Sequence, residues 1–175
     1  MRFPLPATVL VVAAATLPAQ TTQPPNLAAQ RDAMKKLTFL AGKWSGNGTV
    51  IRSAEGPMKL AQTEDVQFKL DGLVMLVEGT GRNPEGQVVF RALATISYDD
   101  LTSTYRFRAH SEGRYIETEL KVLPAGFEWG FTSGPVKVAN IMKLTDKGEW
   151  NEITELTVGS SPPRKTLDMT LKRLP

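Results

Sequence analysis

The chain contains no cysteine and only one histidine, His110. Without cysteine there is no disulfide framework, no thiolate metal site and no lipid attachment to a cysteine. A single histidine excludes metal sites built on two histidines, and a Ser-His-Asp triad would depend on His110 as its base. The sequence therefore predicts a domain held together by its core alone, without a bound metal ion.

Long apolar runs are also scarce, apart from one at the N-terminus. The segment 5–17 is apolar, follows Arg2 and precedes small residues, which is typical of a secretory signal peptide. It is short for a transmembrane helix, although a retained N-terminal anchor is the alternative. We expect residues 1–20 to be a signal peptide and the protein to be periplasmic or secreted, with no stable membrane span after cleavage.

Charge of neither sign dominates the chain. Lys and Arg number 21 against 18 Asp and Glu, and the basic residues are scattered among the acidic ones. Binding to nucleic acid or to an anionic membrane calls for a basic patch or stripe. We therefore expect no nucleic acid among the partners of this protein.

The order of segments predicts one domain after a short linker. Residues 21–26 are polar and contain proline, as a linker does, and residues 27–175 are long enough to bury one core. Residues 27–40 carry apolar side chains, Met34 and Leu37 among them, at the spacing of one amphipathic helix of about three turns. We expect no other helix.

Beyond this helix the sequence alternates between apolar and polar residues and is broken by turn residues. Pairs such as Asp71-Gly72 and Glu112-Gly113 favour tight hairpins, and every connection is too short for a crossover helix. The pattern predicts an all-β, antiparallel up-and-down β-barrel of about ten strands, with a two-sheet sandwich as the alternative. The expected strands are 43–52, 59–70, 73–82, 87–98, 102–110, 113–123, 126–132, 136–145, 148–158 and 164–174.

The first strand combines one tryptophan with small residues on a single face. Gly42, Trp44, Gly46 and Gly48 are two positions apart, so they share one side of an extended segment. A strand that bends tightly as a small barrel closes needs small residues beside an aromatic plug. We expect these four residues to be structural.

The block 40–48 resembles the first strand of the calycin superfamily, which includes lipocalins, fatty-acid-binding proteins and nitrobindins. More narrowly, the chain resembles an uncharacterised family of bacterial secreted lipocalin-like proteins, and the matching segments are 40–48, 69–72, 78–82, 96–99, 105–108 and 129–131. The resemblance implies a closed barrel with a helical lid and an interior cavity, and it implies no established reaction. In lipocalins a basic residue at the end of the last strand packs across the first-strand Trp, so Arg173 is expected over Trp44, with a solvated Arg173 as the alternative.

The resemblance to nitrobindins raises the question of haem. That family's proximal histidine comes late in the chain, but residues 150–171 contain no histidine, and His110 ends the fifth predicted strand. Haem binding is therefore kept only as an alternative function, and we expect no cofactor.

Residues 105–110 alternate aromatic or small side chains with basic ones. If the aromatic face points inward, Arg106 and Arg108 are solvated; if the basic face does, they could clamp a carboxylate or phosphate. The cost of burying unpaired Arg favours the solvated arrangement, and the orientation stays open. Basic, aromatic and methionine side chains of the predicted wall are the candidate ligand-binding residues: Arg106, Arg108, Phe107, Tyr115, Trp129, Met75 and Met142.

Glutamates within predicted strands include Glu64, Glu78, Glu117, Glu119, Glu128, Glu152 and Glu155. Two carboxylates facing each other in a cavity could perform acid–base catalysis, but strand glutamates usually face outward and pair with Lys or Arg. No pair stands out, so we assign no catalytic residue.

Our hypothesis is an exported barrel, monomeric or homodimeric, that binds a small apolar or amphipathic molecule. The alternatives are a cavity enzyme and a solid barrel that acts as an interaction module.

Overall fold

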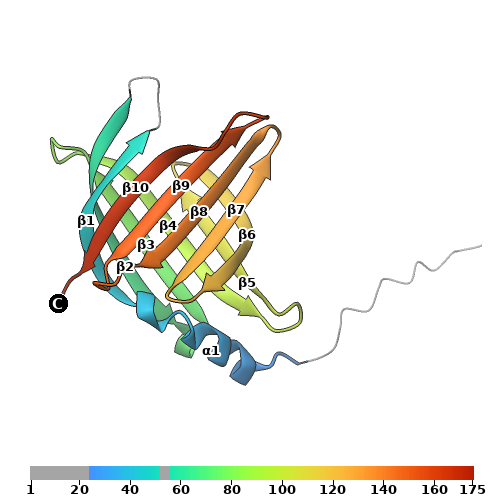
Figure 1. Ribbon diagram of the computed structural model, residues 1–175. Helices are drawn as coiled ribbons and strands as arrows, with labels where there is room; N and C mark the ends of the chain where they lie inside the picture. The colour runs from blue at the N-terminus through green and yellow to red at the C-terminus, as the bar shows by residue number, and fades with distance from the viewer. Residues whose placement is uncertain (1–23, 52–55) are drawn as a thin grey trace, which may run out of the picture.

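The computed structural model describes residues 24–51 and 56–175. Ten antiparallel strands form a closed barrel, and one short helix lies across one end of it (Figure 1). The predicted barrel is therefore confirmed, and the two-sheet sandwich is excluded. The predicted signal peptide lies outside the described residues. The elements are α1 (Leu27–Lys35), the 3₁₀ turn η1 (Thr38–Leu40), β1 (Gly42–Ile51), β2 (Pro57–Lys69), the 3₁₀ turn η2 (Leu70–Gly72), β3 (Val74–Arg82), β4 (Val88–Asp99), β5 (Thr104–Ser111), β6 (Arg114–Leu123), β7 (Gly126–Ser133), β8 (Val136–Leu144), β9 (Trp150–Val158) and β10 (Arg164–Arg173).

Each strand pairs with the next along the chain, and β1 closes the barrel by pairing with β10. The register places Gly46 opposite Gln62 on one side and opposite Leu171 on the other. Side chains alternate between the two faces of each strand, and residues paired across neighbouring strands share a face. The pairing therefore shows which residues of every strand point inward.

The helix begins at an asparagine cap and is tied to the turn between β4 and β5. The side chain of Asn26 accepts a hydrogen bond from the amide of Ala29 at 3.0 Å, and the amide of Asn26 donates to Asp100 at 2.7 Å. Asn26 is thus part of the helix cap rather than of a linker. The helix ends at Lys35, before the predicted residue 40, because the hydroxyl of Thr38 binds the Lys35 carbonyl and a tighter turn follows.

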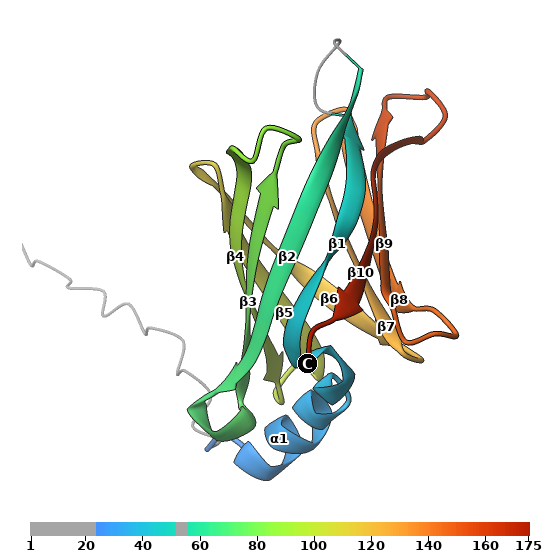
Figure 2. The same ribbon diagram turned by 90° about the vertical axis from the view of Figure 1, so that its left-hand side faces the viewer.

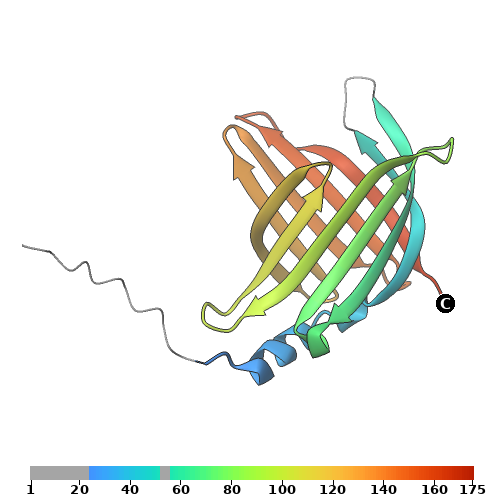
Figure 3. The ribbon, with the colours of Figure 1, turned by 180° about the vertical axis from the view of Figure 1, so that it is seen from behind.

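Seen from behind, α1 lies along one end of the barrel, where it contacts β4 and the η2 turn (Figure 3). Tyr105 of β5 holds it there by donating its hydroxyl proton to the carbonyl of Ala33 at 2.7 Å. In the described part of the chain, no helix has the length and apolar character needed to cross a membrane.

The helix-covered end of the barrel is packed solid. Trp44 is 1 % exposed, donates its indole N–H to the carbonyl of Leu40 at 2.8 Å and meets Trp150 edge to face at 5.6 Å. Met34 and Leu37 close this end from the helix side with no exposed surface. We call this packed end the floor of the barrel.

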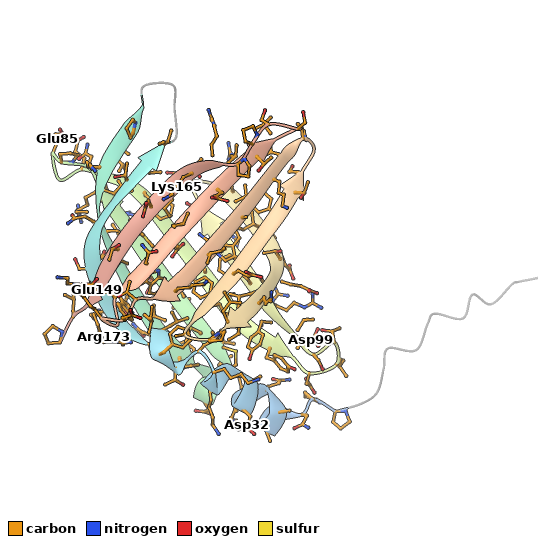
Figure 4. All side chains as sticks on the ribbon, viewed as in Figure 1. Asp32, Glu85, Asp99, Glu149, Lys165 and Arg173 are labelled. Carbon is orange, nitrogen blue, oxygen red and sulfur yellow. The ribbon has the colours of Figure 1, made fainter. Side chains whose placement is uncertain are left out.

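Arg173, at the end of β10, covers the outside of the floor (Figure 4). Its guanidinium carbon lies 4.2 Å from the ring centroid of Trp44, the position that the resemblance implied. It also donates hydrogen bonds to the carbonyls of Phe39 and Ala41. One side chain therefore joins the last strand to the segment that leads into the first.

The small residues of β1 let it approach β10 closely. A Cβ at Gly46 would lie 2.1 Å from the carbonyl oxygen of Thr170 and 2.8 Å from the Cα of Leu171. Both are backbone atoms of the partner strand, so only glycine fits there.

Candidate functional site

Among the described residues, no helix lies across the barrel end opposite α1, which we call the open end (Figure 2). Floor residues such as Met75 and Met142 have no exposed surface, whereas Phe90, Phe131 and Leu156 are partly exposed. The strand register turns these three side chains inward, so the solvent that reaches them must enter the barrel. The upper wall is therefore an accessible apolar surface.

The wall is least continuous between β6 and β7. Their ladder has four residue pairs, from Leu120 with Trp129 to Leu123 with Gly126. Nearer the open end, within the described residues, the two strands share no further ladder pair, although the hydroxyl of Thr118 donates to the carbonyl of Gly130 at 2.7 Å. The interior thus has a loosely joined seam on one side.

Two polar residues of β2 point into the barrel beside the floor. Gln62 is 3 % exposed and Glu64 is 8 % exposed, and the Gln62 amide donates to the Glu64 carboxyl at 2.7 Å. Both side chains lie over glycines of β3. A Cβ at Gly79 would come within 2.8 Å of the Glu64 Oε1, and a Cβ at Gly81 within 2.7 Å of the Gln62 Oε1. These two glycines therefore provide the space that the polar side chains occupy.

Strands β8 and β9 contribute a second polar group. Asn140 donates its amide protons to Glu152 and to Thr154, each at 2.8 Å, and the indole N–H of Trp150 donates to the other Glu152 oxygen at 2.8 Å. Asn140 is 1 % exposed, whereas Glu152 and Thr154 are partly exposed. Solvent in the open half of the barrel therefore reaches this group.

Together these residues form what we call the interior polar cluster: Gln62, Glu64, Asn140, Trp150, Glu152 and Thr154. The carbonyl oxygen of Asn140 is buried and has no hydrogen-bond partner. A buried acceptor without a partner is uncommon in folded proteins, and it often marks the place of a water or a ligand.

Both carboxyl groups of the cluster hold their protons more tightly than an exposed glutamate. Burial raises the pKa of Glu64 from 4.5 to about 8; the hydrogen bond from Gln62 opposes this shift and the nearby Glu152 adds to it. Burial also raises the pKa of Glu152, against the hydrogen bonds from Asn140 and Trp150. At neutral pH, Glu64 is therefore mostly uncharged.

Most of the hydrogen bonds within the cluster run from N–H donors to its carboxyl groups. The described links run from the amides of Gln62 and Asn140 and from the indole of Trp150 to Glu64, Glu152 or Thr154. The Asn140 carbonyl remains as a buried acceptor without a partner, and Glu64 in its protonated form adds one O–H donor. The cluster can hold a proton, and it can accept hydrogen bonds from a guest.

Several residues expected at the ligand site face the interior. Phe107 stacks on Trp129 with ring centroids 4.9 Å apart. Met75 and Met142 also point inward, but they are packed within the floor. Contact of these four residues with a ligand stays a prediction.

Arg106, Arg108 and Tyr115 lie on the outer face of the barrel, so the expectation that they line an interior site is wrong. Arg106 pairs with Asp99 at 3.3 Å, and Arg108 pairs with Glu117 at 3.0 Å. The register explains the placement, because neighbouring Phe107 is 7 % exposed and points into the core. The solvated arrangement of the two arginines is the one found.

His110 also lies on the outer face, exposed, with its ring 4.9 Å from that of Tyr115. It is the only histidine of the chain, so the residues present do not fit a haem held by an interior histidine. Within residues 24–51 and 56–175, no group of three or more acidic or histidine side chains is arranged to hold a metal ion.

Sequence reasoning did not single out the interior polar cluster. The alternation of residues did not distinguish Glu64 and Glu152 from the other strand glutamates, and it did not point to Gln62 or Asn140. The sequence does contain a signal for Gln62 and Glu64. They alternate in step with the apolar residues Leu60 and Val66, which places them on the buried face of the same strand.

No family model and no curated protein matches this chain. Among solved structures, the crystal structure of Rv2717c from M. tuberculosis is similar, with a TM-score of 0.62 and 12 % sequence identity. The match covers 82 % of this chain and 98 % of that one. What the two share is the fold.

Proposed function

We propose that this protein binds a small apolar or amphipathic molecule inside its barrel. The observation that carries the proposal is the arrangement of the interior, where an accessible apolar wall leads down to a polar cluster with an unpartnered buried acceptor. Sites for small molecules are typically concave and mostly apolar, with a few polar groups that fix the orientation of the guest.

The apolar wall would supply most of the binding free energy. Removing an eight-carbon chain from water contributes about 6 kcal/mol at roughly 0.8 kcal/mol per methylene. Part of this is lost to the reduced freedom of the bound molecule. Guests of this size are therefore expected to bind with dissociation constants from about 1 mM to 1 μM.

We further propose that the protein is exported and belongs to the calycin group. The apolar N-terminal segment supports export, and the barrel together with the packing of Arg173 on Trp44 supports the group. Both proposals fit a carrier or receptor of small molecules outside the cytoplasm, acting as a monomer or homodimer.

Native mass spectrometry of protein purified from the periplasm, compared with the same sample denatured, tests binding directly. A discrete extra mass that disappears on denaturation supports the proposal and identifies the guest. In parallel, the neutral dye N-phenyl-1-naphthylamine should bind with increased fluorescence. A clean mass together with no dye binding would contradict the proposal and favour a barrel that acts through its surface.

A matched pair of variants locates the dye. Ala109 points into the open half of the barrel, whereas Ala139 points outward from β8. We expect Ala109→Trp to abolish dye binding and Ala139→Trp to retain it, with both variants keeping the circular dichroism of the wild type. Equal dye binding by the two variants would place the dye outside the barrel.

A carboxylate-dependent enzyme is the second candidate. One observation favours it: Glu64, with its pKa raised to about 8, keeps its proton at neutral pH as a general acid must. Hydrolysis of p-nitrophenyl esters or glycosides that is lost in Glu64→Gln but kept in Glu155→Gln, on the outer face, would support it. No turnover by the wild type across such a panel would remove it.

A further inference from the structure

We infer that the interior polar cluster selects guests that carry a protonated amine on an apolar body, with the ammonium group held by Glu64, Glu152 and the Asn140 carbonyl. This inference rests on the proposed binding function and names the chemical class of its ligand. Its first support is the hydrogen-bonding inventory. An alkylammonium has three N–H donors and no acceptor, and the cluster offers the unpartnered Asn140 carbonyl beside two carboxyl groups.

The charges around the cluster point the same way. The buried polar residues of the described chain are Gln62, Glu64 and Asn140, and no Lys, Arg or His is buried with them. A carboxylate or phosphate head group at this depth would face two carboxyl groups and a carbonyl oxygen without a cation to offset them. An anionic guest is therefore disfavoured, and a cationic one is favoured.

The cluster also contains hydrogen-bond donors that stabilise an ionised carboxyl group when it pairs with a bound cation. A buried ion pair is favourable only where further hydrogen bonds satisfy its remaining atoms. Gln62 donates to Glu64 at 2.7 Å, and both oxygens of Glu152 already accept hydrogen bonds, from Asn140 and from Trp150. These donors stabilise the ionised form of whichever carboxyl group pairs with the ammonium.

Binding of an ammonium ion changes the protonation of Glu64, whereas binding of a neutral guest does not. At neutral pH Glu64 is mostly protonated in the empty barrel, because burial raises its pKa to about 8. When an ammonium ion binds, Glu64 releases its proton to solvent and the resulting carboxylate pairs with the ammonium. A neutral guest leaves that proton in place.

The packing makes room for the Glu64 carboxyl inside the barrel. Gly79 lies beneath the Glu64 carboxyl, and the position of a Cβ there would be 2.8 and 2.9 Å from the two carboxyl oxygens. Glu152 and Thr154 remain partly exposed to the open half of the barrel, so a guest that enters there reaches the cluster directly. The apolar body of the guest then lies along the wall that includes Phe131 and Leu156.

The experiment compares three molecules that share one apolar body: n-octylamine, n-octanol and octanoate. The affinity of each molecule is measured at pH 7 from its displacement of N-phenyl-1-naphthylamine. Isothermal titration calorimetry in buffers of different ionisation enthalpy then gives the number of protons released on binding. We expect octylamine to bind about tenfold or more tightly than octanol, the size of one charge-assisted hydrogen bond, and octanoate to bind most weakly. Binding of octylamine should release up to about one proton, and binding of octanol none.

Variants assign the effect to the cluster. In Glu64→Gln the preference for octylamine over octanol and the proton release should both disappear. Glu155→Gln, on the outer face of β9, is the matched control and should behave as the wild type. If Glu64→Gln does not fold, Glu152→Gln provides the second test, with a reduced preference expected.

The outcomes separate this inference from the function on which it rests. Equal binding of the three molecules, or tightest binding of octanoate at the rim, would overturn the selection of amines and leave a binding barrel. A wild type that binds neither the dye nor any of the three would overturn both. Preference for octylamine retained in Glu64→Gln and in Glu152→Gln would move the amine site away from the cluster.

Discussion

Replacing Glu64 by Gln removes an ionisable group from the barrel interior and keeps an acceptor for the Gln62 amide. In the wild type the Glu64 pKa is about 8 in the folded protein, against 4.5 when exposed. Below about pH 4.5 the carboxyl is protonated in both folded and unfolded chains. Between these values the unfolded chain loses the proton and the folded one keeps it, so the free energy of unfolding falls as the pH rises.

The size of the effect follows from the shift. Each pKa unit corresponds to about 1.4 kcal/mol, so the wild type should lose about 3–6 kcal/mol of stability from Glu64 between pH 4.5 and 8. The Gln variant does not carry this term. It should match the wild type near pH 4.5 and exceed it in stability at pH 8. Glu152, whose pKa is also raised, gives the variant a residual slope of the same sign.

Urea denaturation followed by tryptophan fluorescence, repeated at several values between pH 4.5 and 8.5, measures this difference. Glu155→Gln serves as the control, because it removes an exposed carboxyl from the same barrel. We expect its curve to run parallel to that of the wild type. If the Glu64→Gln curve is also parallel, the Glu64 carboxyl ionises in the folded protein like an exposed one, and the reasoning about the interior fails.

Three further substitutions test how the barrel is held together, each by urea denaturation. Arg173→Ala loses the contact with Trp44 and two hydrogen bonds, and should cost about 2 kcal/mol. Tyr105→Phe removes one of the two hydrogen bonds that the Ala33 carbonyl accepts, leaving the one from the Lys36 amide, and should cost about 1 kcal/mol. Gly46→Ala drives a methyl group into the backbone of β10 and should cost about 3 kcal/mol or prevent folding.

Each of these substitutions has a neighbour as its control. The control for Arg173→Ala is Lys172→Ala on the same strand, that for Gly46→Ala is Ser45→Ala on the same strand, and that for Tyr105→Phe is Tyr115→Phe. Each control changes an exposed or outward-facing side chain, so its free energy of unfolding should stay within about 0.5 kcal/mol of the wild type. A loss as large in a control as in its partner would mean that the barrel responds to any change on that strand. The contact assigned to the partner would then not be the cause.

The strands were predictable because the pattern that identifies each one lies within its own sequence and in the turns beside it. Alternation of apolar and polar residues marks a strand that is buried on one face, and the turns are rich in glycine, proline and aspartate. All ten predicted strands are present, with boundaries that differ by a few residues. The helix was predicted too long because periodicity alone does not reveal that Thr38 competes for the carbonyl of Lys35.

The interior polar cluster was not predictable to the same degree, because it joins residues far apart in the chain. Glu64 and Glu152 lie on β2 and β9, and their meeting inside the barrel depends on closure through β1 and β10. Strand parity could have placed each glutamate on an inner face. It could not have shown that the Asn140 amide donates hydrogen bonds to Glu152 and Thr154 while its carbonyl oxygen has no partner.

The pairing of β1 with β10 also has a consequence for how the chain folds. The hydrogen bond from Arg173 to Ala41 links positions 132 residues apart, and the ladder beside it is similarly long in range. Contacts of this kind form late and slowly, since a long loop must close before they contribute. Until β10 arrives, the first strand has an unpaired edge, which is the part of a barrel most prone to associate with other chains. The chain would therefore be most vulnerable to aggregation just before the ten residues of β10 dock.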